Sequence, residues 1–234
     1  MTQVSQRPTL REIYENHRGR QAMKWDHYLD IYQRYLEPYR GTGAHILEIG
    51  VFKGGSLQIW REYFGDDARL TAIDNDPETQ KVVDEDMMLF IGGQGDPEFL
   101  ATVRDTVPSF DIVIDDGSHV SSDQIASFEC LFPHLNERGL YIVEDVHAGY
   151  WPTHTSPGSP TFIDFASDLV NSQHSWYQHE VGIRSFAEPP SRRAKARPST
   201  EFARQVEALH FHDSILIIEK CPHPEPWVRM FGAP

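Results

Sequence analysis

Acidic and histidine side chains are concentrated in two short segments, Asp-Asp-Gly-Ser-His from position 115 and Glu-Asp-Val-His from position 144. Each segment directly follows an apolar run that is typical of a buried strand. If the two strands are neighbours in a parallel sheet, their ends lie about 5 Å apart and Asp116, Glu144 and Asp145 converge. Converging carboxylates need a cation, and oxygen ligands favour a hard ion such as Mg²⁺. His119 is then expected to be a general base beside the metal.

These acidic residues have a second interpretation, in which they cap the following helices and solvate the edge of the sheet. That interpretation would suffice for a single aspartate. Here four carboxylates and two histidines follow two strands, and neither segment contains a lysine or arginine that would neutralise them. We therefore favour a functional site.

A glycine-containing turn between Gly50 and Ser56 indicates a second part of the site. Glycines let the backbone pass close to a ligand, and the start of the following helix offers free N–H groups. The turn matches neither the GxGxxG dinucleotide fingerprint nor the P-loop, which weakens nicotinamide and nucleoside triphosphate as ligands. Asp74 ends the next apolar run, where a carboxylate can bind both hydroxyls of an adenosine ribose. Its alternative role, capping a helix that starts near Pro77, applies at least equally to Asp76.

The elements that must position these residues follow the βαβ rhythm of a parallel sheet. We expect strands at residues 45–49, 69–73, 87–91, 110–114 and 139–143, and a closing hairpin at 206–211 and 215–218 whose last strand runs antiparallel. Helices are expected at 56–64, from a capping Ser121 or Ser122 through Phe132, and twice between residues 10 and 39. The stripe formed by Trp25, Tyr28, Leu29, Tyr32, Tyr35 and Leu36 is interpreted as core contact.

Length and charge limit the functional classes. A chain of 234 residues fits one α/β domain, which we divide into an N-terminal helical segment, 1–40, acting as a lid or cap, and a main domain, 41–234. The net charge of −14 argues against nucleic acid and anionic membranes as partners. We expect a cytoplasmic protein, because the polar start lacks a signal-peptide pattern and the longest apolar run is far too short for a membrane helix. The two cysteines predict neither a disulfide framework nor a metal knuckle.

Two proline-rich stretches, 152–160 and 187–198, are expected to lack regular structure. Their neighbours are the strand ends where the reaction is expected, so we expect both stretches to be mobile lids that contribute acceptor selectivity. For the basic 187–198 stretch, a solvated surface connection is an equally good interpretation.

Taken together, these motifs resemble a known family. The strand ends Leu47–Val51, Ala72–Asp74, Ile114–His119 and Val143–Asp145 look like those of class I S-adenosylmethionine methyltransferases. More narrowly, they are similar to metal-dependent sugar O-methyltransferases of the mycinamicin and macrocin type, and to the cephamycin-pathway methyltransferase. The resemblance implies a Rossmann-like α/β fold with a mainly parallel seven-stranded sheet, an antiparallel last strand and helices on both faces.

The resemblance also implies roles for individual residues. Asp116, Glu144 and Asp145 would bind Mg²⁺, and His119 would be the general base, so that Asp116 and His119 form the catalytic pair. S-adenosylmethionine would contact Asp115 and the following residues: Glu48, Gly50, Gly54 and Ser56 around its methionine part, Asp74 at its ribose, and Gln94 and Asp96 at its adenine. The chain departs from the family pattern at Gly92–Gln94 and at Ala22–Lys24.

The expected reaction is transfer of a methyl group to a sugar hydroxyl of a glycosylated natural product, with a homo-oligomer as the expected assembly. Mg²⁺ would lower the pKa of the hydroxyl and orient it while His119 takes the proton. Two alternatives remain open at this point. One is a catechol-type O-methyltransferase that binds a flat ring, and the other is a non-catalytic S-adenosylmethionine-binding protein.

Overall fold

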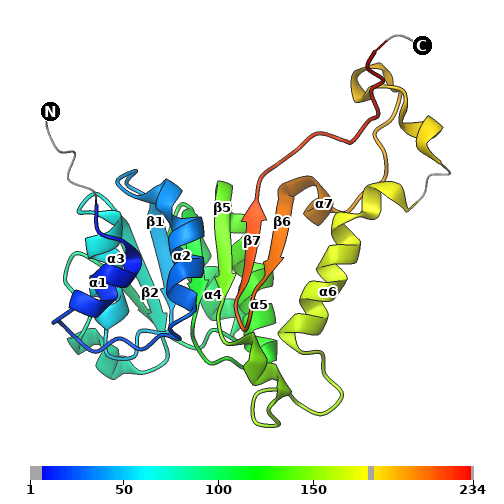
Figure 1. Cartoon of the computed structure of the whole chain (residues 1–234). Coiled ribbons are helices and arrows are strands. Elements are labelled where there is room, and N and C mark those ends of the chain that lie inside the picture. The colour runs from blue at the N-terminus through cyan, green and yellow to red at the C-terminus, as the bar shows by residue number, and fades with distance from the viewer. Residues whose placement is uncertain (1–6, 179–181, 233–234) are drawn as a thin grey trace, which may run out of the picture.

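A seven-stranded sheet forms the centre of the computed structural model, which describes residues 7–178 and 182–232. The strand order is β3-β2-β1-β4-β5-β7-β6, and β7 is antiparallel to both of its neighbours (Figure 1). The strands are β1 (His45–Ile49), β2 (Arg69–Asp74), β3 (Met88–Ile91), β4 (Phe110–Asp115), β5 (Leu135–Val143), β6 (Val206–Phe211) and β7 (Leu216–Lys220). The mainly parallel sheet of seven strands with an antiparallel last strand is confirmed, and β5 begins at Leu135, before the expected residue 139.

Helices cover both faces of the sheet. The α-helices are α1 (Leu10–Asn16), α2 (Tyr28–Leu36), α3 (Gly55–Phe64), α4 (Pro97–Thr106), α5 (Ser121–Leu131), α6 (Phe162–Gln173) and α7 (Glu201–Gln205). Short 3-10 helices connect them: η1 (Glu37–Tyr39), η2 (Pro77–Lys81), η3 (Phe132–His134), η4 (Val146–Tyr150), η5 (Ser175–Tyr177), η6 (Ile183–Phe186) and η7 (Pro190–Arg192).

Side chains that point alternately to the two faces of the sheet form two separate hydrophobic cores. Ile46 and Ile112 face one side, where they pack with Trp60 of α3 and with apolar residues of α1 and α2. Leu47 and Val113 face the other side and pack with apolar residues of α4, α5 and α6. Because successive strand residues point to opposite faces, a strand buried on both sides reads as a continuous apolar run. The expected N-terminal pair of helices thus contributes directly to one core.

Two local expectations are wrong. Neither Ser121 nor Ser122 caps α5; the N-cap is Val120, and the Ser121 hydroxyl instead pairs with Thr155 Oγ1 at 2.8 Å. The 152–160 stretch contains no helix or strand, as expected, but η7 interrupts the 187–198 stretch because Pro190 presets a helical turn. None of the helices formed by the described residues is long and apolar enough to cross a membrane.

Candidate active site

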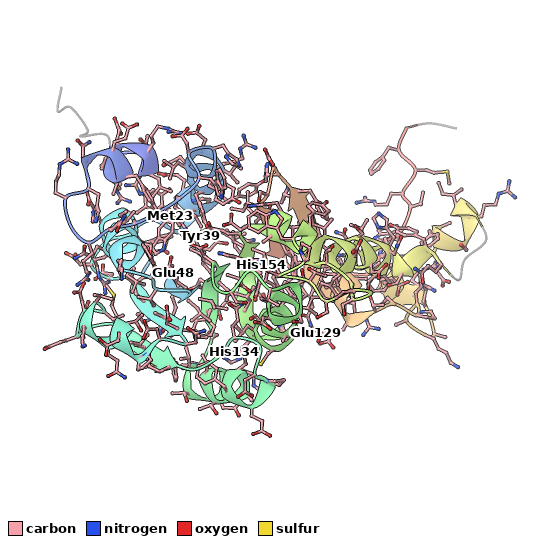
Figure 2. All side chains as sticks on the ribbon, turned by 90° about the horizontal axis from the view of Figure 1, so that it is seen from below. Met23, Tyr39, Glu48, Glu129, His134 and His154 are labelled. Atoms are coloured by element: carbon pink, nitrogen blue, oxygen red, sulfur yellow. The ribbon has the colours of Figure 1, made fainter. Side chains whose placement is uncertain are left out.

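A pocket of about 660 Å³ lies at the carboxyl ends of the parallel strands. Its walls come from the turns after β1, β2, β3, β4 and β5, and the connection between α1 and α2 closes one side. Met23 of that connection lines the pocket, and Figure 2 labels it together with Glu48 of β1. Ligands of open α/β sheets bind at this edge. The glycine turn and both acidic segments are therefore parts of one site.

Three of the predicted residues form a compact group that could hold a metal ion. Asp116, His119 and Asp145 each offer one ligand atom, and these atoms lie within 4.8 Å of one another. His119 Nε2 is 3.9 Å from Asp116 Oδ1 and 3.8 Å from Asp145 Oδ2. The donors of an octahedral ion with bonds of about 2.1 Å lie roughly 3.0 Å apart in cis and 4.2 Å apart in trans. The spacing of the group therefore fits a small divalent cation.

His119 is suited to accept a proton. Burial lowers the pKa of its imidazole, and the nearby Asp116 and Asp145 only partly oppose this shift. Its Nδ1 atom is buried and has no hydrogen-bond partner among the described residues. His119 also has a left-handed backbone, with φ of 55°. Such a conformation is costly for a residue other than glycine and is concentrated at functional sites.

Glu144 lies beside this group, and its carboxylate contacts Lys24. The Lys24 ammonium bonds both Asp116 and Glu144, and the lysine side chain is only 2% exposed. Tyr32 of α2 donates its hydroxyl to the same Glu144 oxygen. Burial alone would lower the pKa of Lys24, but the charges of Asp116 and Glu144 outweigh burial and raise it. Asp116 and Glu144 are thus close enough to share one cation.

The N-terminal segment also holds Asp145. Trp25 Nε1 donates to Asp145 Oδ1 at 2.9 Å, and the hydroxyl of Tyr28 donates to the same oxygen at 2.7 Å. The Tyr28 hydroxyl in turn accepts the Asp145 backbone N–H at 3.2 Å. These contacts leave Asp145 Oδ2 facing His119. The sequence analysis missed these contacts, because it interpreted the aromatic stripe only as part of the core. A signal was available, since the two acidic segments contain no lysine or arginine and must therefore find donors or a cation elsewhere in the chain.

The predicted cofactor residues divide into two sets. Gly50, Ser56, Asp74 and Gln94 line the pocket, whereas Glu48, Gly54, Asp96 and Asp115 are absent from its lining. Glu48 is buried behind the wall, where it accepts from Ser56 Oγ at 2.8 Å. Burial raises its pKa to about 7.

The other residues behind the pocket support its walls. Gly54 is the N-cap of α3, with φ of 75°, and Asp96 is the N-cap of α4. Asp115 accepts from the Gln94 amide at 2.9 Å, and burial raises the pKa of Asp115 to about 7. Asp96 caps its helix through the backbone N–H groups that follow it, so its side chain is directed to that helix.

Asp74 projects to the site from the end of β2. Its Oδ2 accepts from the Val51 N–H at 2.8 Å and its Oδ1 accepts from the Asp76 N–H at 2.8 Å. Each oxygen retains a second lone pair that a ligand hydroxyl could use. The expected helix-capping role belongs to Asp76, which accepts from the Glu78 N–H at the start of η2.

Gly50 explains why the first turn needs glycine. Its φ is 95°, and a Cβ atom there would lie 2.2 Å from the Asp116 carbonyl oxygen. The turn after β1 and the turn after β4 therefore approach each other as closely as two backbones can. That contact fixes the cofactor side of the pocket against the acidic group.

Comparison with known proteins agrees with this geometry. Residues 47–146 match a family model described as a methyltransferase domain. The chain contains a methyltransferase domain. The matched range of this domain includes the glycine turn, Asp74 and both acidic segments.

Relatives of the methyltransferase domain act on sugars. The chain is 34% identical over 209 residues to 8-demethyl-8-alpha-L-rhamnosyl tetracenomycin-C 2'-O-methyltransferase of Streptomyces olivaceus, covering 82% of this chain and 50% of that protein. It is 33% identical over 200 residues to mycinamicin VI 2''-O-methyltransferase of Micromonospora griseorubida, covering 81% and 47%. The resemblance to sugar O-methyltransferases is thereby confirmed. The chain spans about half the length of these curated relatives.

Solved structures confirm the fold. The MycE methyltransferase of the mycinamycin biosynthetic pathway, in complex with Mg and SAH, matches with a TM-score of 0.77 and 26% identity. The match covers 97% of this chain and 58% of that chain. The methyltransferase domain therefore has the class I fold that its motifs predict.

Proposed function

We propose that this chain transfers a methyl group from S-adenosylmethionine to a hydroxyl group of a sugar attached to a natural product. The observation that carries the proposal is the placement of Asp116, His119 and Asp145 on the wall of one pocket at the carboxyl edge of the methyltransferase domain. The sugar O-methyltransferase names of the relatives support the choice of acceptor. A neutral imidazole and a cation site at one wall are what deprotonation of a weakly acidic hydroxyl requires.

The cofactor would occupy the part of the pocket between the turns after β1, β2 and β3. Gly50 permits close approach of its methionine part, and Asp74 has lone pairs free for the ribose hydroxyls. Gln94 lines the pocket, where it donates to Asp115, and it would face the adenine. S-adenosylmethionine supplies an electrophilic methyl group on a sulfonium when it is bound. Glu48, Gly54 and Asp96 would support this part of the pocket from behind its lining.

The metal would be held by Asp116, Glu144 and Asp145. The donor chemistry fits, because all three residues offer carboxylate oxygens, and Asp116 and Glu144 already contact one cation together, the Lys24 ammonium. When bound, Mg²⁺ would orient an acceptor hydroxyl and lower its pKa. The Lys24 ammonium and a bound Mg²⁺ would together balance the charges of the three carboxylates, and Trp25 and Tyr28 fix the orientation of Asp145.

His119 would take the proton of the acceptor hydroxyl. Its lowered pKa keeps the imidazole neutral near pH 7, and its Nε2 faces Asp116 and Asp145, which stabilise the imidazolium once it forms. His119 is therefore proposed as the catalytic base rather than as a metal ligand.

Transfer of labelled methyl groups tests the proposal. The protein would be incubated with labelled S-adenosylmethionine and either rhamnosylated polyketides or catechols, with Mg²⁺ or with exhaustive chelation. We expect label on the glycosides, and no label after chelation. His119→Ala should lose transfer while still binding Mg²⁺, whereas Asp116→Asn should lose both. Label on catechols alone would replace the acceptor class, transfer after chelation would remove the metal, and absence of all transfer would favour a non-catalytic binding protein. A cytoplasmic location stays a prediction.

A further inference from the structure

A row of aromatic rings begins beside Asp145, and we refer to it as the aromatic row. It consists of four side chains whose rings contact one another in succession: Trp25, His147, Trp151 and His154. The successive ring centroids are 5.8, 5.0 and 5.5 Å apart. At one end, Trp25 Nε1 donates to Asp145 Oδ1 at 2.9 Å. At the other end, the N–H at position 121, two residues after the proposed base, donates to the His154 carbonyl at 2.9 Å. Both ends of the row are therefore tied to segments of the proposed active site.

Local contacts fix the orientation of these rings. The His147 imidazole pairs through Nδ1 with the Ser214 hydroxyl in the turn between β6 and β7. The Trp151 N–H donates to the Ala148 carbonyl at 2.8 Å, and the His154 N–H donates to the Trp151 carbonyl at 2.9 Å. The three ring contacts have interplanar angles of 81°, 82° and 71°, which is the edge-to-face geometry that aromatic pairs prefer. A ligand that binds to the row would therefore not have to order it first, which favours binding.

The aromatic row is open to solvent. Trp25 is 52% exposed and Trp151 is 50% exposed, and Tyr150 beside Trp151 is 70% exposed. The connection from η4 to α6, which carries residues 147–154, lies at the edge of the sheet where the parallel strands end (Figure 1). Large apolar side chains gathered on one exposed surface beside a pocket are typical of a ligand-binding site.

The two proline-rich stretches lie at opposite edges of the sheet. The 152–160 stretch directly follows Trp151 and includes His154 of the aromatic row. The 187–198 stretch lies at the far edge in Figure 1, where Arg193 pairs with Glu225 of the segment after β7, and it is absent from the pocket lining. The expectation that the 187–198 stretch closes over the pocket of its own chain is therefore wrong.

The size of the pocket indicates that an acceptor must extend beyond it. A volume of about 660 Å³ is the size that encloses one drug-sized ligand, and S-adenosylmethionine would take the part between the turns after β1, β2 and β3. Only the reacting hydroxyl of the acceptor has to reach His119 and Asp145. The rest of a glycosylated natural product would lie against the wall that continues outward from Asp145. That wall is the aromatic row, of which Trp25 lines the pocket and the other three rings lie outside its lining.

We propose that the aromatic row binds the acceptor, with Trp25 against the reacting sugar and Trp151 against the ring to which that sugar is attached. The inference rests on the proposed function. Trp25 contacts Asp145 directly, whereas Trp151 lies one ring further away, beyond His147, so the order of the rings gives the order of the two subsites. The face of an aromatic ring carries partial negative charge, which attracts the C–H groups of a sugar and the edge of another ring. The attached ring can be a flat aglycone or a second sugar, because both present such groups.

Isothermal titration of glycosides into the full chain, loaded with S-adenosylhomocysteine and saturating Mg²⁺, tests the proposal without turnover. The probes are methyl rhamnoside, phenyl rhamnoside and a disaccharide that ends in rhamnose. Trp151→Ala should raise the Kd of phenyl rhamnoside or of the disaccharide by at least about fivefold, and that of methyl rhamnoside by less than about twofold. An effect on phenyl rhamnoside identifies a flat aglycone, and an effect on the disaccharide identifies a second sugar. Trp151→Phe retains a ring and should retain most of the affinity.

Trp25→Ala tests the inner subsite. It should raise the Kd of all three probes, including methyl rhamnoside, because each contains the reacting sugar. Saturating Mg²⁺ is needed here because the substitution also removes a donor to Asp145. Trp227→Ala is the matched control, since Trp227 is 41% exposed and belongs to the segment after β7, which extends from the opposite edge of the sheet (Figure 1). The control should bind all three probes like the wild type.

The affinity for S-adenosylhomocysteine, measured separately, shows that each variant is folded and should not change. Three results would overturn the inference and leave the proposed function intact: unchanged affinity of Trp151→Ala for both larger probes, an equal loss for methyl rhamnoside in that variant, or unchanged affinity of Trp25→Ala for methyl rhamnoside. Weaker binding by Trp227→Ala would also overturn it, because the loss would then not be specific to the row. A wild type that neither binds a glycoside nor transfers a methyl group to one would overturn the proposed function together with the inference.

Discussion

Replacing Tyr28 by phenylalanine probes how the N-terminal segment controls the proposed metal site. The Tyr28 side chain is completely buried, and its hydroxyl donates to Asp145 Oδ1 at 2.7 Å and accepts the Asp145 N–H at 3.2 Å. The Asp145 backbone has φ of 52°, a left-handed conformation for a residue with a side chain. The substitution retains the ring and removes the hydroxyl oxygen, which contacts Asp145 and also lies 2.9 Å from the Ser214 carbonyl oxygen.

The size of the effect follows from the contacts that remain. Trp25 still donates to Asp145 Oδ1, so the carboxylate loses one of two side-chain donors, while the Asp145 N–H loses its acceptor. Loss of a hydrogen bond to a charged group, with a buried N–H left unpaired, costs about 1–3 kcal/mol of folding stability. Groups that orient metal ligands typically contribute roughly 10–100-fold to metal affinity. We expect both losses in Tyr28→Phe.

Isothermal titration of Mg²⁺ into the folded protein measures the affinity directly, without an acceptor. Tyr35→Phe is the matched control, because Tyr35 lies on the same helix and its hydroxyl pairs with His212 Nε2 at 3.1 Å, outside the acidic group. The control should bind Mg²⁺ like the wild type. Denaturant unfolding of both variants would give the stability change.

Two outcomes would refute this reasoning in different ways. Unchanged Mg²⁺ affinity in a folded Tyr28→Phe variant would show that the Tyr28 hydroxyl of α2 does not orient Asp145 for metal binding. Absence of Mg²⁺ binding in the wild type, with His119→Ala and Tyr35→Phe equally inactive as metal binders, would instead remove the metal from the proposed function.

Three further predictions concern the walls of the pocket and the core. Gly50→Ala should lower the free energy of unfolding by at least about 1–2 kcal/mol, because residue 50 has a positive φ and a Cβ atom there would clash with the turn after β4. Gly93→Ala is the control and should leave the stability unchanged in denaturant unfolding, because the space around its Cβ position is open. Burial lowers the pKa of His45 to about 4, so the unfolded chain binds the proton first. Stability from this group is complete above about pH 6.5 and declines by up to about 3 kcal/mol as the pH falls toward 4; His45→Phe should remove that part of the pH dependence. Asp74→Ala should weaken S-adenosylmethionine binding in calorimetry by about tenfold, and an unchanged affinity would end the ribose assignment.

The sheet could be predicted from the sequence because its signals are local. Each parallel strand is an apolar run that stops at glycine or a carboxylate, and these stops mark the edge where the pocket lies. The convergence of Asp116 and Asp145 also follows from local signals, because β4 and β5 are neighbours with Asp115 opposite Val143. The place of residues 187–198 could not be predicted, since a proline-rich basic stretch carries no information about which edge of the sheet it reaches.

The aromatic stripe of α2 shows that helical periodicity predicts which rings are buried but does not predict the partners of their hydroxyl groups. Its period correctly places the rings of Tyr28 and Tyr32 in the core, where both are fully buried. A tyrosine has a polar end as well, and a buried hydroxyl must find a partner, so each of these rings implies a polar group nearby. The acidic segments after β4 and β5 pose the complementary problem, because they contain carboxylates without a cation or enough donors. Lys24 and the hydroxyls of Tyr28 and Tyr32 supply the missing donors, and the carboxylates supply the acceptors that the buried hydroxyls need. Matching the buried donors of one segment with the carboxylates of another would therefore have predicted these contacts from the sequence.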